Sequence, residues 1–192
     1  MRTTKRLLHT GLLAISILLH SICYGQVYAQ NGMVVSDNKV ASQVGTDILK
    51  KGGNAIDASI ATAFALAVTH PQAGNIGGGG FLVYLDSKGE STAIDFREKA
   101  PLSATPDMYL NNEGQLIKGS NHSGLKSVGV PGTVAGLYLA HQKYGSLSWK
   151  DLVQPSIELA ENGVVLSWIL AKHAEYFISS NSSEFLKTYY TH

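Results

Sequence analysis

Residues 67–85 read AVTHPQAGNIGGGGFLVYL and contain the order of elements that decides the fold. Residues 55–68, which lead into this stretch, are almost wholly apolar and rich in alanine, a pattern typical of a buried helix. Pro71 ends that helix. Residues 81–96 then predict a hairpin of two short strands around a Ser-Lys-Gly-Glu turn. A glycine run therefore connects a helix to a hairpin.

The glycine run at residues 77–80 does not have the context of a phosphate-binding loop. A dinucleotide fingerprint follows a strand and opens a helix, whereas this run follows a helix and opens a strand. No Lys-Ser or Lys-Thr pair follows it, which excludes a P-loop. The run therefore indicates a close backbone approach between a buried helix and a sheet.

The remaining pattern is mainly helical. The stripe of Val40, Val44 and Ile48 predicts an amphipathic helix that begins near residues 36–38 and ends at Gly52. Further predictions are a strand at 33–35, a loop over 111–127, a helix over 133–144, a helix over 149–161 divided by Pro155, and a helical start to 168–190. Because helices bracket a hairpin, we expect a layered α+β fold of the α/β/β/α type and not a parallel doubly wound sheet.

The first 29 residues have the pattern of a secretory signal peptide. Basic residues at 2, 5 and 6 precede a short apolar core at 11–19 and a Val-Tyr-Ala end at 27–29. An uncleaved anchor and a lipid-modified Cys23 are the alternatives, and both fit less well. Cleavage would change the formal net charge from +1 to −2 and remove Cys23, the one cysteine. We expect residues 30–192 to be periplasmic or secreted.

Composition excludes several classes of protein. The 192 residues are 44% hydrophobic and 15% charged, too few charges for charge-driven disorder. The near balance of 15 basic and 14 acidic residues gives no reason to expect a nucleic-acid partner. The apolar core at 11–19 is too short to span a bilayer, so no membrane association is expected after signal cleavage.

Arg97 is the best chemical candidate, because it stands where the second strand ends and a Pro-bounded loop begins. A guanidinium at such a place can hold a carboxylate through two parallel hydrogen bonds. Its neighbours Asp95 and Glu98 offer the alternative of a structural ion pair, which the residues alone favour.

Other reactive residues form no recognisable site. The spacing of His70, His122, His141 and His173 matches no metal-binding motif. The sequence contains no GxSxG motif, and none of its Ser or Thr residues has an evident base beside it. Two glycosylation-type triplets begin at Asn121 and Asn181, a short pattern that often arises by chance.

Five motifs together resemble the N-terminal part of the γ-glutamyltranspeptidase large subunit. The resemblance covers residues 32–165, in order and in register, and is only loose over 166–192. The motifs are MVVS at 33–36, DILKKGGNAIDA at 47–58, AVTHPQAGNIGGGGF at 67–81, TAIDFREKAP at 92–101 and GVPGTVAG at 129–136.

This resemblance implies an N-terminal-nucleophile hydrolase with an αββα sandwich, incomplete in this chain. Such enzymes are made as one precursor that cleaves itself, and the new N-terminal Thr of the small subunit becomes the nucleophile. That Thr takes the γ-glutamyl group from glutathione or another γ-glutamyl compound and passes it to water or to an amino-acid or peptide acceptor. The family needs no metal or organic cofactor.

The family's substrate-gripping Arg in the Asp-Phe-Arg-Glu motif falls on Arg97, where it would bind the α-carboxylate of the donor. No catalytic residue falls within this chain, because the nucleophile and the oxyanion hole lie beyond His192 in the family pattern. We therefore expect residues 30–192 to be a truncated portion of the large subunit. Alone, this portion should be inactive and poorly soluble. Activity should need the missing C-terminal part and the small subunit. The alternatives are a non-catalytic exported module that binds γ-glutamyl compounds or amino acids, and a fragment of a related β-lactam acylase.

Overall fold

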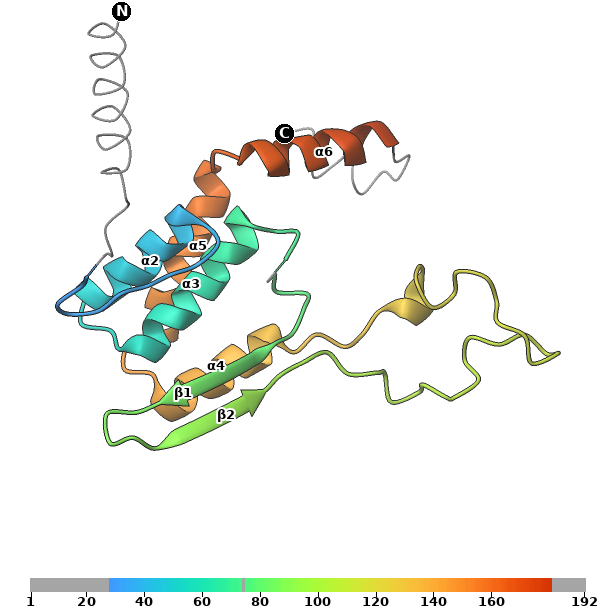
Figure 1. Cartoon of the computed structure of the whole chain (residues 1–192), viewed down its shortest axis with the longest axis horizontal. Coiled ribbons are helices and arrows are strands. Elements are labelled where there is room, and N and C mark those ends of the chain that lie inside the picture. Colours follow the sequence, from blue (N-terminus) through green and yellow to red (C-terminus); the bar gives the residue numbers. More distant parts are fainter. Residues whose placement is uncertain (1–27, 74, 181–192) are drawn as a thin grey trace, which may run out of the picture. The chain divides into compact units, whose positions relative to one another are not determined.

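The computed structural model describes residues 28–73 and 75–180, and side chains up to residue 176 (Figure 1). Most of the expected signal peptide, Cys23 and Asn181 lie outside the described residues. The chain divides into two compact units, Met1–Gly32 and Met33–His192. All helices and strands described below belong to the second unit. None of the described helices is both long enough and apolar enough to cross a membrane.

Helices α2 (Lys39–Lys50) and α3 (Ala55–Thr69) begin where their capping residues predict. The Asn38 side chain accepts hydrogen bonds from the backbone N–H groups of Val40 and Ala41. Asn54 and Asp57 form a reciprocal capping box at the start of α3. Both helices are therefore confirmed, and α3 packs against both α2 and α5 (Trp149–Asn162).

The buried face of α2 differs from the predicted stripe. Ala41, Gly45 and Ile48 are buried, whereas Val40 is 42% exposed. Small residues at 41 and 45 let α2 approach α3 closely, and a Cβ on Gly45 would collide with the Thr62 hydroxyl. Close packing of two backbones, and not the largest apolar side chains, therefore decides which face of α2 is covered.

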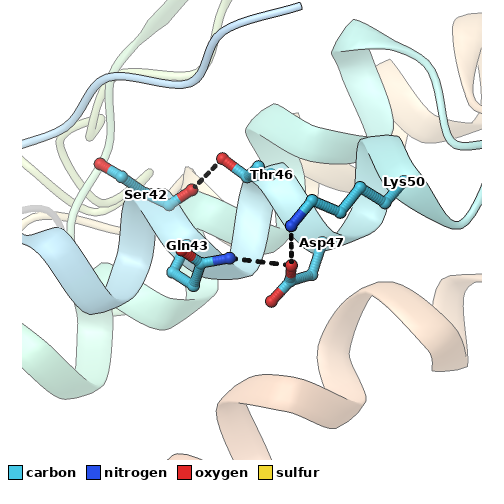
Figure 2. A network of polar contacts seen from close by, with 5 residues as sticks. All are labelled: Ser42, Gln43, Thr46, Asp47 and Lys50. Atoms are coloured by element: carbon cyan, nitrogen blue, oxygen red, sulfur yellow. Dashed lines mark hydrogen bonds and ion pairs between the residues drawn. The ribbon is translucent and has the colours of Figure 1, made fainter.

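The opposite face of α2 has its own polar contacts, shown in Figure 2. The Asp47 carboxylate accepts from the Gln43 amide at 2.9 Å and from the Lys50 ammonium at 3.2 Å. The Thr46 hydroxyl donates to the carbonyl of Ser42 at 2.8 Å. These bonds join residues three or four positions apart, so they support the helix itself.

Strands β1 (Phe81–Leu85) and β2 (Ser91–Asp95) form the predicted antiparallel hairpin, with Val83 opposite Ala93. The inner face contains Leu82, Tyr84 and Ile94, which pack on the core, and β2 contacts helix α4 (Thr133–Tyr144). On the outer face of β1 the side chains of Phe81, Val83 and Leu85 are 65%, 80% and 66% exposed. This hairpin thus has one covered face and one bare apolar face.

The prediction of a strand at residues 33–35 is wrong. In the part of the chain that the structure describes, the sheet consists of two strands, β1 and β2. Val34 packs on the core as a side chain, beside Gly45 of α2, without joining a ladder. Met33 and Val35 on either side of it are 52% and 81% exposed, so this short apolar run predicted neither a pairing partner nor general burial.

Helices α4 (Thr133–Tyr144), α5 (Trp149–Asn162) and α6 (Trp168–Ser180) complete the fold. The predicted division of α5 is wrong, because the helix continues through Pro155. Leu152 and Ser156 flank Pro155 and are both buried, and α5 packs on α3, so tertiary packing outweighs the lost backbone bond. Ile48, Ile60 and Leu152 are the large apolar side chains at the centre of the core.

A long connection leaves the hairpin at its base and returns to start α4 (Figure 1). Its two ends pair at Lys99 and Val130 through two backbone hydrogen bonds, of 2.8 and 3.2 Å. Between them lie turns, a single bridge from Leu110 to Leu116 and a short 3-10 helix, Leu125–Ser127. The prediction of a loop over residues 111–127 is confirmed in outline.

Candidate functional site

The glycine run packs directly on the end of β2 and the start of α4. A Cβ on Gly79 would stand 2.6 Å from the backbone nitrogen of Glu98, so only glycine fits there. The carbonyl of Gly78 accepts hydrogen bonds from the N–H groups of Gly132 at 2.9 Å and Thr133 at 3.0 Å. The close backbone approach is confirmed, with the 96–98 segment and the first turn of α4 as the neighbours.

Phe96 fixes the other side of this junction. Its N–H and carbonyl pair with Gly80, and its ring lies against Gly136 of α4 at a distance that leaves no room for a Cβ. Gly132 likewise faces the carbonyl of Phe96. The backbone that leads into residue 97 is therefore held by β1, by the glycine run and by α4 together.

Arg97 is the first exposed residue after this fixed point. Its N–H donates to the Asp95 carboxylate at 3.0 Å, and the residue lines a cavity of about 270 Å³ between the edge of β2 and α4. The ion pairs of the described residues are Lys50–Asp47 and Lys172–Glu175. The guanidinium is thus not paired with Asp95 or Glu98, and the structural ion-pair interpretation of Arg97 is wrong for this structure.

Lys99 lines the same cavity and was missed by sequence reasoning. Asp95, Arg97 and Lys99 all line this cavity, as residues two positions apart do when they share one side of an extended chain. Glu98 lies on the other side, with its carboxylate near Gly78 and its Cβ near Gly129. The spacing of two in an extended segment was the signal that could have identified Lys99.

Asp57 has a second role that the capping box did not reveal. The side chain is fully buried, and it accepts hydrogen bonds from the N–H and hydroxyl of Ser146, in the connection between α4 and α5. Burial by itself would raise the pKa of Asp57, but the bonds from Ser146, Asn54 and Leu147 outweigh it and hold that pKa below its usual value. Asn54 adds a bond from its amide to the carbonyl of Tyr144 at 2.7 Å.

The structure does not bring the histidines together. His70 contacts Gln72 at 3.1 Å, and His141 contacts the carbonyl of Leu147 at 2.8 Å. No group of three His, Cys, Asp or Glu side chains suited to a metal ion occurs in residues 28–73 and 75–180. Within those ranges no hydrogen bond joins a Ser or Thr hydroxyl to a histidine ring. What the described site can do chemically is hold an anion at Arg97.

Comparison with known proteins gives one consistent result. Residues 41–191 match the family model for "Gamma-glutamyltranspeptidase", which extends the expected resemblance beyond residue 165. A "Glutathione hydrolase proenzyme" of Pseudomonas sp. (strain A14) is 50% identical over 163 residues, which are 85% of this chain and 28% of that protein. The chain spans about a quarter of the length of the curated relatives it matches.

Solved structures agree in fold. The γ-glutamyltranspeptidase of Helicobacter pylori superposes with a TM-score of 0.80 at 43% identity, covering 86% of this chain and 48% of that one. A cephalosporin acylase from Bacillus halodurans superposes with a TM-score of 0.68 at 32% identity, covering 84% and 31%. The expected α+β fold of the N-terminal-nucleophile hydrolases is confirmed, and the described elements are a part of it.

Proposed function

Because the chain belongs to the γ-glutamyltranspeptidase family, we propose that it forms the donor-binding part of a glutathione hydrolase or γ-glutamyltransferase. The donor would be glutathione or another γ-glutamyl compound. The acceptor would be water, an amino acid or a peptide. The names and the 50% identity of the curated relatives support this activity over others.

Arg97 is the observation that carries the proposal. Its guanidinium is exposed, lines a cavity and makes no ion pair within the described residues, while the backbone before it is held from three sides. A planar fork of N–H donors on a fixed backbone suits a free α-carboxylate. Binding of that carboxylate would orient the γ-carbonyl for attack.

The bond-making groups belong to the remainder of the enzyme in this proposal. An N-terminal Thr of a small subunit, released by self-cleavage of a precursor, attacks the γ-carbonyl and expels cysteinylglycine from glutathione. Its own α-amino group takes the hydroxyl proton. Water or an amine then releases the γ-glutamyl group. No metal or organic cofactor enters these steps, and residues 28–180 contribute binding and not a catalytic group.

Export is a further part of the proposal. Residues 1–29 act as a cleaved signal peptide, and the enzyme acts in the periplasm or outside the cell. The basic start and the short apolar core support this location. Mass spectrometry of the intact exported protein tests it, because cleavage after Ala29 leaves an N-terminus that begins at Gln30, as glutamine or as its cyclised pyroglutamate form.

The experiment expresses the whole reading frame, from codon 1 to its stop codon, and measures release of glutamate or cysteinylglycine from glutathione. Arg97→Lys keeps the charge and loses the fork, so KM for γ-glutamyl donors should rise about tenfold or more while self-cleavage continues. Lys88→Arg, in the exposed hairpin turn, is the matched control and should change nothing. An unchanged KM in Arg97→Lys would remove Arg97 from the site.

Two alternatives predict other results. A non-catalytic binding module predicts a stop codon directly after codon 192 and binding of γ-glutamyl compounds without turnover. A β-lactam acylase predicts hydrolysis of acylated cephalosporins in preference to glutathione. The lower identity of the cephalosporin acylase, 32% against 43% for the H. pylori enzyme, favours the γ-glutamyl substrate.

A further inference from the structure

We infer that Lys99 is a specificity-determining residue that selects γ-glutamyl donors with a second, C-terminal carboxylate. The inference rests on the proposed function, since it assigns Arg97 to the donor's α-carboxylate. It adds a second anchor in the same cavity and thereby names the substrate class as γ-glutamyl peptides with a free C-terminus.

The first step is placement. Asp95, Arg97 and Lys99 are spaced two positions apart and all line the cavity of about 270 Å³, while Lys99 also lines a neighbouring cavity of about 190 Å³ with Glu98. Successive residues on one side of an extended chain are about 6.6 Å apart. A γ-glutamyl peptide carries a carboxylate at each end, and the long side chains of Arg97 and Lys99 can diverge from these neighbouring backbone positions to reach both.

The second step is the fixed position of Lys99. Its N–H donates to the carbonyl of Val130 at 3.2 Å, and its own carbonyl accepts from the N–H of Val130 at 2.8 Å. This two-way pairing holds the backbone of residue 99 against the start of α4. The flexible side chain therefore extends from an anchored point, as that of Arg97 does.

The third step is charge. Neither Arg97 nor Lys99 belongs to the ion pairs found among the described residues, which lie on α2 and α6. Asp95 is the one acidic residue of the cavity lining, and it already accepts the N–H of Arg97. With two cations and one anion, the cavity carries a formal charge of +1 and favours a donor whose second carboxylate makes it net negative over the corresponding amide, which is net neutral.

The test compares glutathione with its C-terminal glycinamide, which lacks only the second carboxylate. The whole reading-frame product is used at low ionic strength, and Kd or KM is measured for both compounds. Since a partly exposed lysine–carboxylate pair contributes little, the wild type should prefer the acid by about fivefold. High salt should reduce that preference.

Variants separate specificity from folding. Lys99→Met should bind both compounds equally, with the amide unaffected, while Lys99→Arg should keep the preference. Lys88→Met is the control for a lost surface charge and should behave as the wild type. Far-UV circular dichroism checks that each variant is folded.

Each outcome decides between the two proposals. Equal binding of acid and amide by the wild type, or an unchanged preference in Lys99→Met, overturns the inference while the role of Arg97 stands. If neither compound binds to the wild type, the proposed function fails and this inference fails with it. A preference that Lys99→Met abolishes and Lys99→Arg keeps supports both.

Discussion

Replacing Asp57 by Asn should destabilise the fold by about 2 kcal/mol, although it changes one oxygen to a nitrogen. The carboxylate uses both oxygens: it accepts from Asn54 N–H at 3.0 Å and from Ser146 N–H at 3.1 Å, and it also binds the Ser146 hydroxyl. Asparagine can keep its one acceptor oxygen at Oδ2, which also lies 3.2 Å from the Ser146 N–H, but its NH2 group then replaces Oδ1 and faces that N–H, donor against donor.

The magnitude follows from these bonds. A hydrogen bond to a charged group contributes about 1.5–3 kcal/mol, and a neutral one about 0.5–1.5 kcal/mol. The substitution lowers the retained bonds to the neutral range and places the asparagine NH2 group against the Ser146 N–H. Because Ser146 is exposed, water reaches that group and keeps the cost toward the lower end. A loss of about 2 kcal/mol is a large part of a domain's usual stability of about 5–15 kcal/mol.

The assay is urea unfolding followed by circular dichroism at several pH values. The folded pKa of Asp57 lies below its unfolded value of about 3.9, so its stabilisation is complete above about pH 5 and is lost progressively as pH falls through the folded pKa. The difference between wild type and Asp57→Asn should therefore be greatest near pH 7 and shrink below pH 4.

Asp86→Asn is the matched control. One oxygen of Asp86 accepts both N–H groups of the hairpin turn, from Lys88 at 2.8 Å and Glu90 at 2.9 Å, so asparagine can replace it. Its cost should stay below about 0.5 kcal/mol. If Asp57→Asn were equally mild, or its effect were the same at pH 3 and pH 7, the argument from the buried carboxylate would be refuted.

Three further predictions concern packing. Gly136→Ala should cost about 1–3 kcal/mol in chemical unfolding despite alanine's better helix propensity, because the new Cβ meets the ring of Phe96; a neutral result would mean that the ring moves aside. Leu152→Ala should lower the free energy of unfolding by about 2–5 kcal/mol and Val40→Ala by less than about 0.5 kcal/mol. Equal losses in the two variants would mean that Val40 is buried after all. Val83→Thr should reduce light scattering by the 192-residue chain made alone, and unchanged scattering would show that the bare face of β1 does not cause aggregation.

Elements whose signals are local could be predicted from the sequence. Asn54 followed by Asp57 marked the start of α3, and the apolar runs around a Lys-Gly turn marked the hairpin. The errors concern which other segment of the chain an element pairs with or packs against. Residues 33–35 have the composition of a strand, but the described sheet provides no neighbour for them. Pro155 has the pattern of a break, but the packing of α5 on α3 outweighs it.

The functional site could be predicted less well than the fold from the residues alone. Arg97 beside two acids suggested an ion pair, and the resemblance to a family, not the local chemistry, indicated a ligand-binding role. The second role of Asp57 joins it to Ser146, 89 residues away, and no local pattern encodes that contact. Lys99 differs, because alternation along an extended segment was visible in the sequence.

The paired ends of the long connection have a consequence for tolerance to changes in length. Since the backbones of Lys99 and Val130 are hydrogen-bonded to each other, the 30 residues between them form a loop whose two ends stay in place. Doubling the length of such a loop adds only about 0.6 kcal/mol to the entropic cost of closing it. Insertions, deletions or a grafted reporter domain should therefore be accepted there without shifting Arg97 or the first turn of α4.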